Sequence, residues 1–180
     1  MPYQNYRRNY KKNYGNLNKK KWASFMKASS AGPLTVPLSG SGYLAIDLVA
    51  NSTETAIPTP TIIKCKHFKV SVDTYVNSTA YVILGPIVAY LIYVPQGYTL
   101  STSTPTDHPE WVLSWRNVDT SHSTTNNATF HESITMTSSL SRNLNSGDSI
   151  KLILVASNVN ASNTFNLNAI SHFSCVLRNN

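Results

Sequence analysis

The sequence FNLNAISHFSCVL, residues 165–177, decides the fold because its apolar and polar side chains alternate. An alternation with a period of two is typical of a β-strand that buries one face and exposes the other. Polar side chains such as Asn166, Asn168 and His172 lie on the predicted outer face, so we expect a half-buried strand here. The predicted core face consists of Phe165, Leu167, Ala169, Phe173, Cys175 and Leu177.

The same period recurs in earlier segments of the chain. Tyr43–Ala50 and Ile134–Leu140 alternate in this way. Ile150–Ala156 also alternates, and it follows Asn145–Asp148, whose sequence NSGD is typical of a tight turn. Ile87–Val94 is instead apolar almost throughout, which indicates a strand whose two faces are both covered.

Two local irregularities are expected in this pattern. Ile62–Tyr75 reads as one long strand, but its apolar residues change phase, and a bulge or break near Lys66-His67 reconciles the two phases. In the turn before residue 150, we expect Gly147 to take a positive φ. The two phases are formed by Ile63 and Cys65 and by Phe68, Val70 and Val72.

The composition agrees with an all-β protein. The chain has 180 residues, of which only 13% are charged, and Ser, Thr and Asn are abundant. No amphipathic helix longer than two turns is recognisable, and the alternating segments, together with Trp111–Val118, amount to about seven to nine strands. We therefore predict a single jelly roll of two packed four-stranded antiparallel sheets, formed by residues 42–180.

The first 27 residues, MPYQNYRRNYKKNYGNLNKKKWASFMK, differ from the rest in charge. They carry eight of the 15 basic residues and no acid, whereas the remainder of the chain is close to neutral. This separation predicts that residues 1–27 form an arm that holds a polyanion, while the body has another task. The basic residues are Arg7, Arg8, Lys11, Lys12, Lys19, Lys20, Lys21 and Lys27.

Aromatic residues are interleaved with these charges. Tyr6, Tyr10 and Tyr14 recur every four residues, and Trp22 closes the run. Lys and Arg neutralise phosphates, and aromatic rings stack on unpaired bases, so the mixture favours single-stranded nucleic acid over duplex. A helical stripe is disfavoured by the many Asn residues. A solvated basic tail, or a nuclear-import signal, is the alternative interpretation.

Residues 28–41, ASSAGPLTVPLSGS, are expected to form a linker between the arm and the body. They contain small residues, two prolines and glycine, which are typical of connecting segments. The apolar stretch Ala80–Val94 is broken by Gly85-Pro86 and is too short for a helix that crosses a membrane. We therefore expect no membrane insertion.

Two groups of residues are candidate metal or catalytic sites. Cys65 and His67, with His172 and Cys175, could supply zinc ligands, but positions i and i+3 of a strand face opposite sides, so we favour free core thiols. Asp107, His108 and Glu110 cluster in one loop and could support acid–base chemistry, but they equally read as a loop before a strand. We expect no enzyme activity, no catalytic residue, no metal and no cofactor.

Two segments resemble a known family. IVAYLIYVPQGYTLSTSTPTDHPEWVLSWRNVD, Ile87–Asp119, and SSLSRNLNSGDSIKLILVASN, Ser138–Asn158, are similar to segments of capsid proteins from circovirus-like viruses, which have small circular single-stranded DNA genomes and encode a replication initiator. The order of the two segments and the basic N-terminal arm are also similar in kind. The arm departs from the family pattern because it is shorter and rich in Lys, Tyr and Asn rather than Arg.

This resemblance implies a viral jelly roll that assembles with other copies of itself into a small icosahedral (T=1) shell of about sixty subunits. The arm would face inward and package the single-stranded DNA genome, in a virion assembled in the host nucleus. Loops 51–61, 95–110 and 119–132 would form subunit contacts and an outer surface for a host receptor. The alternatives are a nucleic-acid-binding β-barrel that does not assemble and a glycan-binding β-sandwich.

Overall fold

The computed structural model describes residues 22–36, 39–51, 61–77, 86–118, 129–157 and 163–179. These residues form nine strands, a four-residue helix and a short 3-10 turn. None of the helical segments within these ranges has the length and hydropathy needed to cross a bilayer. The elements are β1 (Ala23–Val36), β2 (Ser41–Ala50), β3 (Thr61–Asn77), β4 (Ile87–Val94), α1 (Thr104–Asp107), η1 (Pro109–Trp111), β5 (Val112–Val118), β6 (Thr129–Ser138), β7 (Arg142–Leu144), β8 (Ser149–Ser157) and β9 (Asn163–Asn179).

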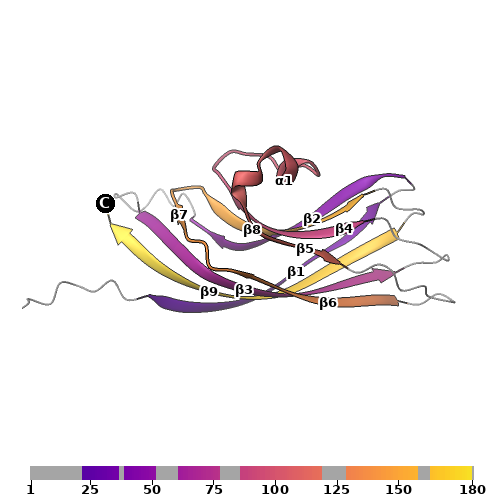
Figure 1. Cartoon of the computed structure of the whole chain (residues 1–180), viewed down its shortest axis with the longest axis horizontal. Helices are drawn as coiled ribbons and strands as arrows, with labels where there is room; N and C mark the ends of the chain where they lie inside the picture. Colours follow the sequence, from indigo (N-terminus) through magenta and orange to yellow (C-terminus); the bar gives the residue numbers. More distant parts are fainter. Residues whose placement is uncertain are drawn as a thin grey trace, which may run out of the picture.

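The strands form two antiparallel sheets that lie one above the other (Figure 1). The five-stranded sheet has the order β1-β9-β3-β6, and the short β7 also pairs with β3. The four-stranded sheet has the order β2-β8-β4-β5. The predicted all-β sandwich is confirmed, with β7 as one strand more than the two four-stranded sheets that we expected.

The pairing of the strands is nested. β1 pairs with β9, β2 with β8, β3 with β6, and β4 with β5, so strands from the two halves of the chain meet in order. This is the pattern of one long hairpin that has been rolled so that its paired strands alternate between two sheets. Two packed antiparallel sheets of this kind define a jelly-roll sandwich.

The core lies between the two sheets. Leu44, Ile46 and Leu48 of β2 face Phe68 of β3 and Leu167 of β9 in one buried cluster, as the period of two predicted. A fully buried side chain of this size contributes about 1.5–3 kcal/mol to folding. The alternation therefore specifies both the inner face of each strand and most of the energy that holds the sheets together.

A second apolar cluster covers the outer face of the four-stranded sheet. Ile92 and Val94 of β4 and Ile153 of β8 are buried there beneath Tyr98 and Trp111. In Figure 1 the segment that contains α1 lies on this outer side of the sheet. The prediction that β4 is covered on both faces is thus confirmed, and the covering element is the loop that follows β4.

β3 contains the predicted bulge. Its register against β9 shifts between Lys66 and Lys69, and His67 takes a φ of 55°. The shift keeps Cys65 before the bulge and Phe68 after it on the same buried side. The change of phase between the apolar residues before and after His67 is therefore caused by one extra residue in β3.

The linker predicted for residues 28–41 is corrected over residues 28–36, which lie in β1. This strand pairs with β9 from Ala23 to Val36, with a register shift between Ala31 and Leu34. It occupies the edge of its sheet, and most of its side chains are exposed. Because few of its residues enter the core, its sequence lacks the apolar alternation that identifies the other strands.

Candidate nucleic-acid interface

Two of the predicted arm residues lie within the described part of the chain, Trp22 and Lys27. The other ten lie outside it, and their predicted role stays a prediction. They are Tyr6, Arg7, Arg8, Tyr10, Lys11, Lys12, Tyr14, Lys19, Lys20 and Lys21. The described structure therefore shows where the arm joins the body and which surface it meets there.

Trp22 immediately precedes β1 and contacts Lys66 of β3. The Nζ atom of Lys66 lies 3.8 Å from the centroid of the Trp22 ring, which places the ammonium group over the aromatic face. The ring quadrupole attracts such a cation. Trp22 is still 39% exposed, so its ring and the Lys66 charge form one solvent-facing unit where the arm meets the outer face of the five-stranded sheet.

Three lysines of β3 share this outer face. Lys64 and Lys66 precede the bulge and Lys69 follows it, and all three point away from the buried side that carries Cys65 and Phe68. Without the bulge, Lys69 would lie on the opposite face from the other two, because strand side chains alternate. The extra residue thus places three cations on the face of the sheet where Lys66 contacts Trp22.

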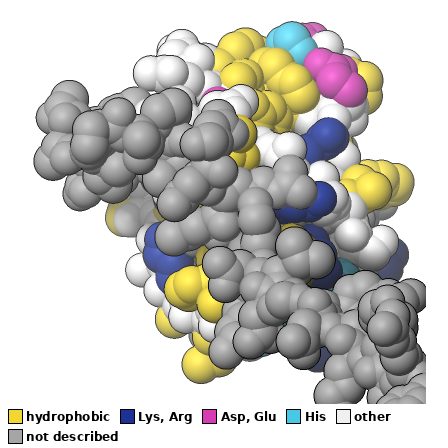
Figure 2. Space-filling view, turned by 90° about the vertical axis from the view of Figure 1, so that its left-hand side faces the viewer, with side chains coloured by type: hydrophobic (Ala, Val, Ile, Leu, Met, Phe, Trp, Pro, Cys, Tyr) yellow, Lys and Arg dark blue, Asp and Glu magenta, His cyan; other side chains and the backbone are white. Residues whose placement is uncertain are grey.

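The body is neutral in total but its charges are segregated. On the outer face of the five-stranded sheet, the described residues include one acidic side chain, Asp73, which accepts a hydrogen bond from Ser133. Asp47 belongs to the other sheet, where it pairs with Lys151 at 2.7 Å. Figure 2 shows acidic and histidine side chains gathered at one edge of the molecule, with Lys and Arg side chains below them.

Lys27 lies on the opposite side of β1 from this face. Its Nζ atom donates a hydrogen bond to the backbone oxygen of Asp47 at 2.6 Å, and its own backbone oxygen accepts one from Ser171 at 3.2 Å. These contacts join β1 to β2 and β9. Lys27 therefore has a role within the body, whereas Trp22 belongs to the basic outer face.

The four candidate zinc ligands lie in two different environments. Cys65 and Cys175 are buried in the core, while His67 and His172 are exposed. This confirms that His172 and Cys175 point to opposite sides of β9. In the ranges that the structure describes, no three His, Cys, Asp or Glu side chains come close enough together to hold a metal ion.

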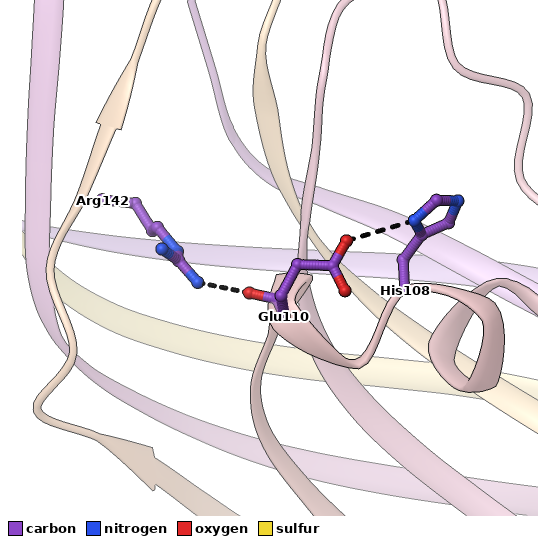
Figure 3. A network of polar contacts seen from close by, with 3 residues as sticks. All are labelled: His108, Glu110 and Arg142. Carbon is purple, nitrogen blue, oxygen red and sulfur yellow. Dashed lines mark hydrogen bonds and ion pairs between the residues drawn. The ribbon is translucent and has the colours of Figure 1, made fainter.

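The loop residues Asp107, His108 and Glu110 have structural partners. Asp107 accepts a hydrogen bond from Ser103 at 2.6 Å, and Nδ1 of His108 lies 3.2 Å from a carboxylate oxygen of Glu110. Arg142 donates to the backbone oxygen of Glu110 at 2.5 Å, as Figure 3 shows. A hydrogen bond from its own backbone holds the pKa of Glu110 below the usual range, so this carboxylate is a poor proton donor near neutral pH.

A groove of about 580 Å³ lies on the outer face of the four-stranded sheet, beside the loop that contains α1. Val88 and Tyr90 of β4 and Trp115 of β5 form one wall, and Pro105 and Pro109 belong to the other. Trp115 is 58% exposed. The groove thus offers two aromatic side chains to a ligand from solvent, on the sheet that does not carry the lysines of β3.

The sequence analysis did not identify Lys64, Lys66 and Lys69 of β3 as a group of cations on one face. The signal was present, because the phase change that predicted the bulge also places Lys64, Lys66 and Lys69 together on the outer face. By number alone, these lysines are balanced by the acidic residues of the body. A count of charges carries no information about which face of a sheet each charge occupies.

No protein-family model and no curated protein matches the sequence. Among solved structures, the chain is similar to Desmodium yellow mottle tymovirus, with 13% identity over 86% of this chain and 87% of that chain and a TM-score of 0.32. It is also similar to infectious bursal disease virus Gt strain, with 9% identity over 88% of this chain and 41% of that chain and a TM-score of 0.26.

Proposed function

We propose that the chain is the subunit of a small icosahedral viral shell that packages a circular single-stranded DNA genome through its basic arm. The observation that carries the proposal is the segregation of charge on a jelly-roll sandwich. The polycationic segment ends at Trp22, whose ring contacts Lys66 at the basic outer face of the five-stranded sheet. The resemblance of residues 87–119 and 138–158 to circovirus-like capsid proteins supports the same proposal.

The physical basis of packaging is phosphate neutralisation. Each Lys or Arg that contacts a phosphate releases condensed counterions, so binding is strong at low salt and independent of base sequence. Trp22 adds an exposed ring that can stack on an unpaired base. The face on β3 extends the cationic surface of the arm, and the arm and this face together form the nucleic-acid surface in this proposal.

Assembly of the purified full-length protein tests the shell. Negative-stain imaging and sedimentation are expected to show closed particles of uniform size, whose nucleic acid resists nuclease. A monodisperse small species that binds nucleic acid would instead support the β-barrel protein that does not assemble. A small species without nucleic-acid binding would overturn the proposal.

The contribution of the sheet face is tested with single-charge variants. We expect Lys69→Gln to reduce the slope of log affinity against log salt by about 0.7 for single-stranded DNA, the value of one phosphate contact. Arg116→Gln is the matched control, since Arg116 is an exposed cation on β5 of the other sheet. Equal slopes for Lys69→Gln and the unmodified protein would restrict nucleic-acid binding to the arm.

One observation favours a second candidate function, recognition of a glycan. The groove beside Trp115 and Tyr90 combines aromatic side chains with the polar Asn117. Binding sites for small ligands combine an apolar wall with a few polar groups in this way. Titration with oligosaccharides, followed by tryptophan fluorescence in the native protein and in Trp115→Ala, distinguishes this candidate from the shell subunit.

A further inference from the structure

Cys65 and Cys175 are directly opposite each other in the five-stranded sheet. Cys65 lies on β3 and Cys175 on β9, and their Cα atoms are partners in the antiparallel register. Opposed residues in such a pair have Cα atoms about 4.5–5.5 Å apart, which is within the range that a disulfide spans. Both side chains point into the core, with exposed fractions of 0% and 8%, and the two Sγ atoms are 2.7 Å apart.

The two thiols are chemically unequal. The contact between the two sulfur atoms, and then burial, raise the pKa of Cys65, whereas the same contact lowers the pKa of Cys175. Cys175 is also the more exposed of the two. Thiol–disulfide exchange requires an accessible thiolate, so Cys175 is the group that can attack first.

The access route to Cys175 runs along the edge of the sheet. Ala23, the first residue of β1, is the register partner of Cys175, and Phe25 stacks on Phe173 with ring centroids 5.9 Å apart. β1 is an edge strand with mostly exposed side chains. Local opening of this end of β1 uncovers Cys175 without separating β3 from β9.

We propose that Cys65 and Cys175 form an intrachain disulfide when the folded protein meets a low-molecular-weight disulfide such as oxidised glutathione. The thiolate of Cys175 attacks one sulfur of the small disulfide, whose S–S bond breaks and releases one small thiol. The thiol of Cys65 then loses its proton and attacks Sγ of Cys175, which releases the second small thiol. The cysteine pair gives up two electrons and two protons, and the small disulfide takes them up as two thiols.

The bond would join residues 110 positions apart, and one of them, Cys65, lies on the strand that carries the basic face. A cross-link across so long a loop removes much of the conformational entropy of the unfolded chain. It also fixes β3 to β9 immediately before the bulge at Lys66. Oxidation would therefore stabilise the part of the sheet that holds Lys64, Lys66 and Lys69 in line.

The test uses the full-length protein incubated with an excess of oxidised glutathione, then acid-quenched and alkylated under denaturing conditions. Intact mass is expected to show a species two hydrogens lighter that takes no alkyl group, and peptide mapping is expected to link Cys65 to Cys175. The thermal unfolding midpoint is expected to rise by about 10 °C and to return on reduction.

Two variants separate the steps. Cys65→Ala is expected to accumulate one glutathione adduct on Cys175, because the second attack is missing. Cys175→Ala is expected to remain unmodified, because Cys65 is fully buried. The proposal is overturned if the protein without substitutions still takes two alkyl groups after incubation, or if it forms only disulfides between chains. This test does not depend on whether either variant folds.

Discussion

The hydroxyl of Tyr93 donates a hydrogen bond of 2.8 Å to a carboxylate oxygen of Asp148, which joins the end of β4 to the turn before β8. The same carboxylate accepts from the backbone N–H groups of Gln96 at 3.0 Å and Asn145 at 2.8 Å. Asp148 is only 4% exposed, so its charge is compensated by these three donors. The NSGD turn is thus anchored by its last residue.

This contact makes stability depend on pH in the alkaline range. Burial, and then the bond to Asp148, raise the pKa of Tyr93 from its usual 10 to about 12. A raised pKa in the folded state means that the unfolded chain loses this proton first, so the contribution of Tyr93 is complete below pH 10 and declines as the pH rises to about 12. Urea unfolding across this range is expected to show a steeper decline for the native protein than for Tyr93→Phe; parallel curves would contradict it.

Gly147 tests the same turn through its backbone. It has a φ of 86°, as predicted, and a Cβ atom at this position would lie 2.9 Å from Cβ of Gln96. We expect Gly147→Ala to destabilise the protein by about 1–3 kcal/mol through backbone strain and this overlap. Gly97→Ala is the control, because Gly97 has a φ of 77° but nothing within 4 Å of its added Cβ. Chemical denaturation should rank Gly147→Ala below Gly97→Ala, and equal losses would exclude a role for Gln96.

Deletion of the arm should be made at residue 21 rather than residue 27. Removal of residues 1–21 is expected to leave the unfolding midpoint unchanged and to abolish most co-purification with nucleic acid. Removal of residues 1–27 also deletes Phe25 and the Lys27 contact with Asp47, and is expected to cost about 1–3 kcal/mol more. Thermal unfolding and the ratio of absorbance at nucleic-acid and protein wavelengths measure the two effects. Undiminished nucleic-acid binding after the shorter deletion would assign binding to the body.

The tyrosines of the arm are tested separately from its charges. A peptide of residues 1–21 is expected to bind single-stranded oligonucleotides more tightly than duplexes, with little dependence on base order and a steep dependence on salt. Replacement of Tyr6, Tyr10 and Tyr14 by alanine is expected to weaken binding by about 1–3 kcal/mol for each base that loses its stacking partner. Fluorescence anisotropy over a series of salt concentrations measures both the contribution of the charges and the contribution of tyrosine stacking. Equal binding by the tyrosine-free peptide would leave the charges as the whole interaction.

Most strands of the fold could be predicted because their buried residues leave a recognisable pattern in the sequence. β2, β4 and β9 were recognised because their buried positions follow a period of two or are apolar throughout, and the bulge in β3 followed from its change of phase. β1 could not be recognised in the same way. Its identity as a strand depends on backbone pairing with β9, about 140 residues away, and its own side chains are small and exposed.

The candidate site was also predictable only in part, because several of its contacts join segments that are far apart in the sequence. Trp22 stood out because it closes a basic run, but its contact with Lys66 requires that β1 and β3 both flank β9. The residues His108 and Glu110 are recognisable as a cluster in one segment, whereas the bond from Arg142 to the backbone of Glu110 joins β7 to η1. Contacts of this kind depend on tertiary pairing, and no local pattern in one segment specifies them.

The nested pairing of the strands also sets an order for folding during synthesis. β4 and β5 are close in sequence and can pair early, whereas β1 waits for β9, the last strand of the described chain. Closing such a long loop carries the largest entropic cost, so the β1–β9 pair is expected to form late and slowly. The strand that follows the cationic segment can thus complete its pairing with β9 only after translation has passed residue 175. The junction between the cationic segment and the sheet is therefore expected to be among the last parts of the fold to form.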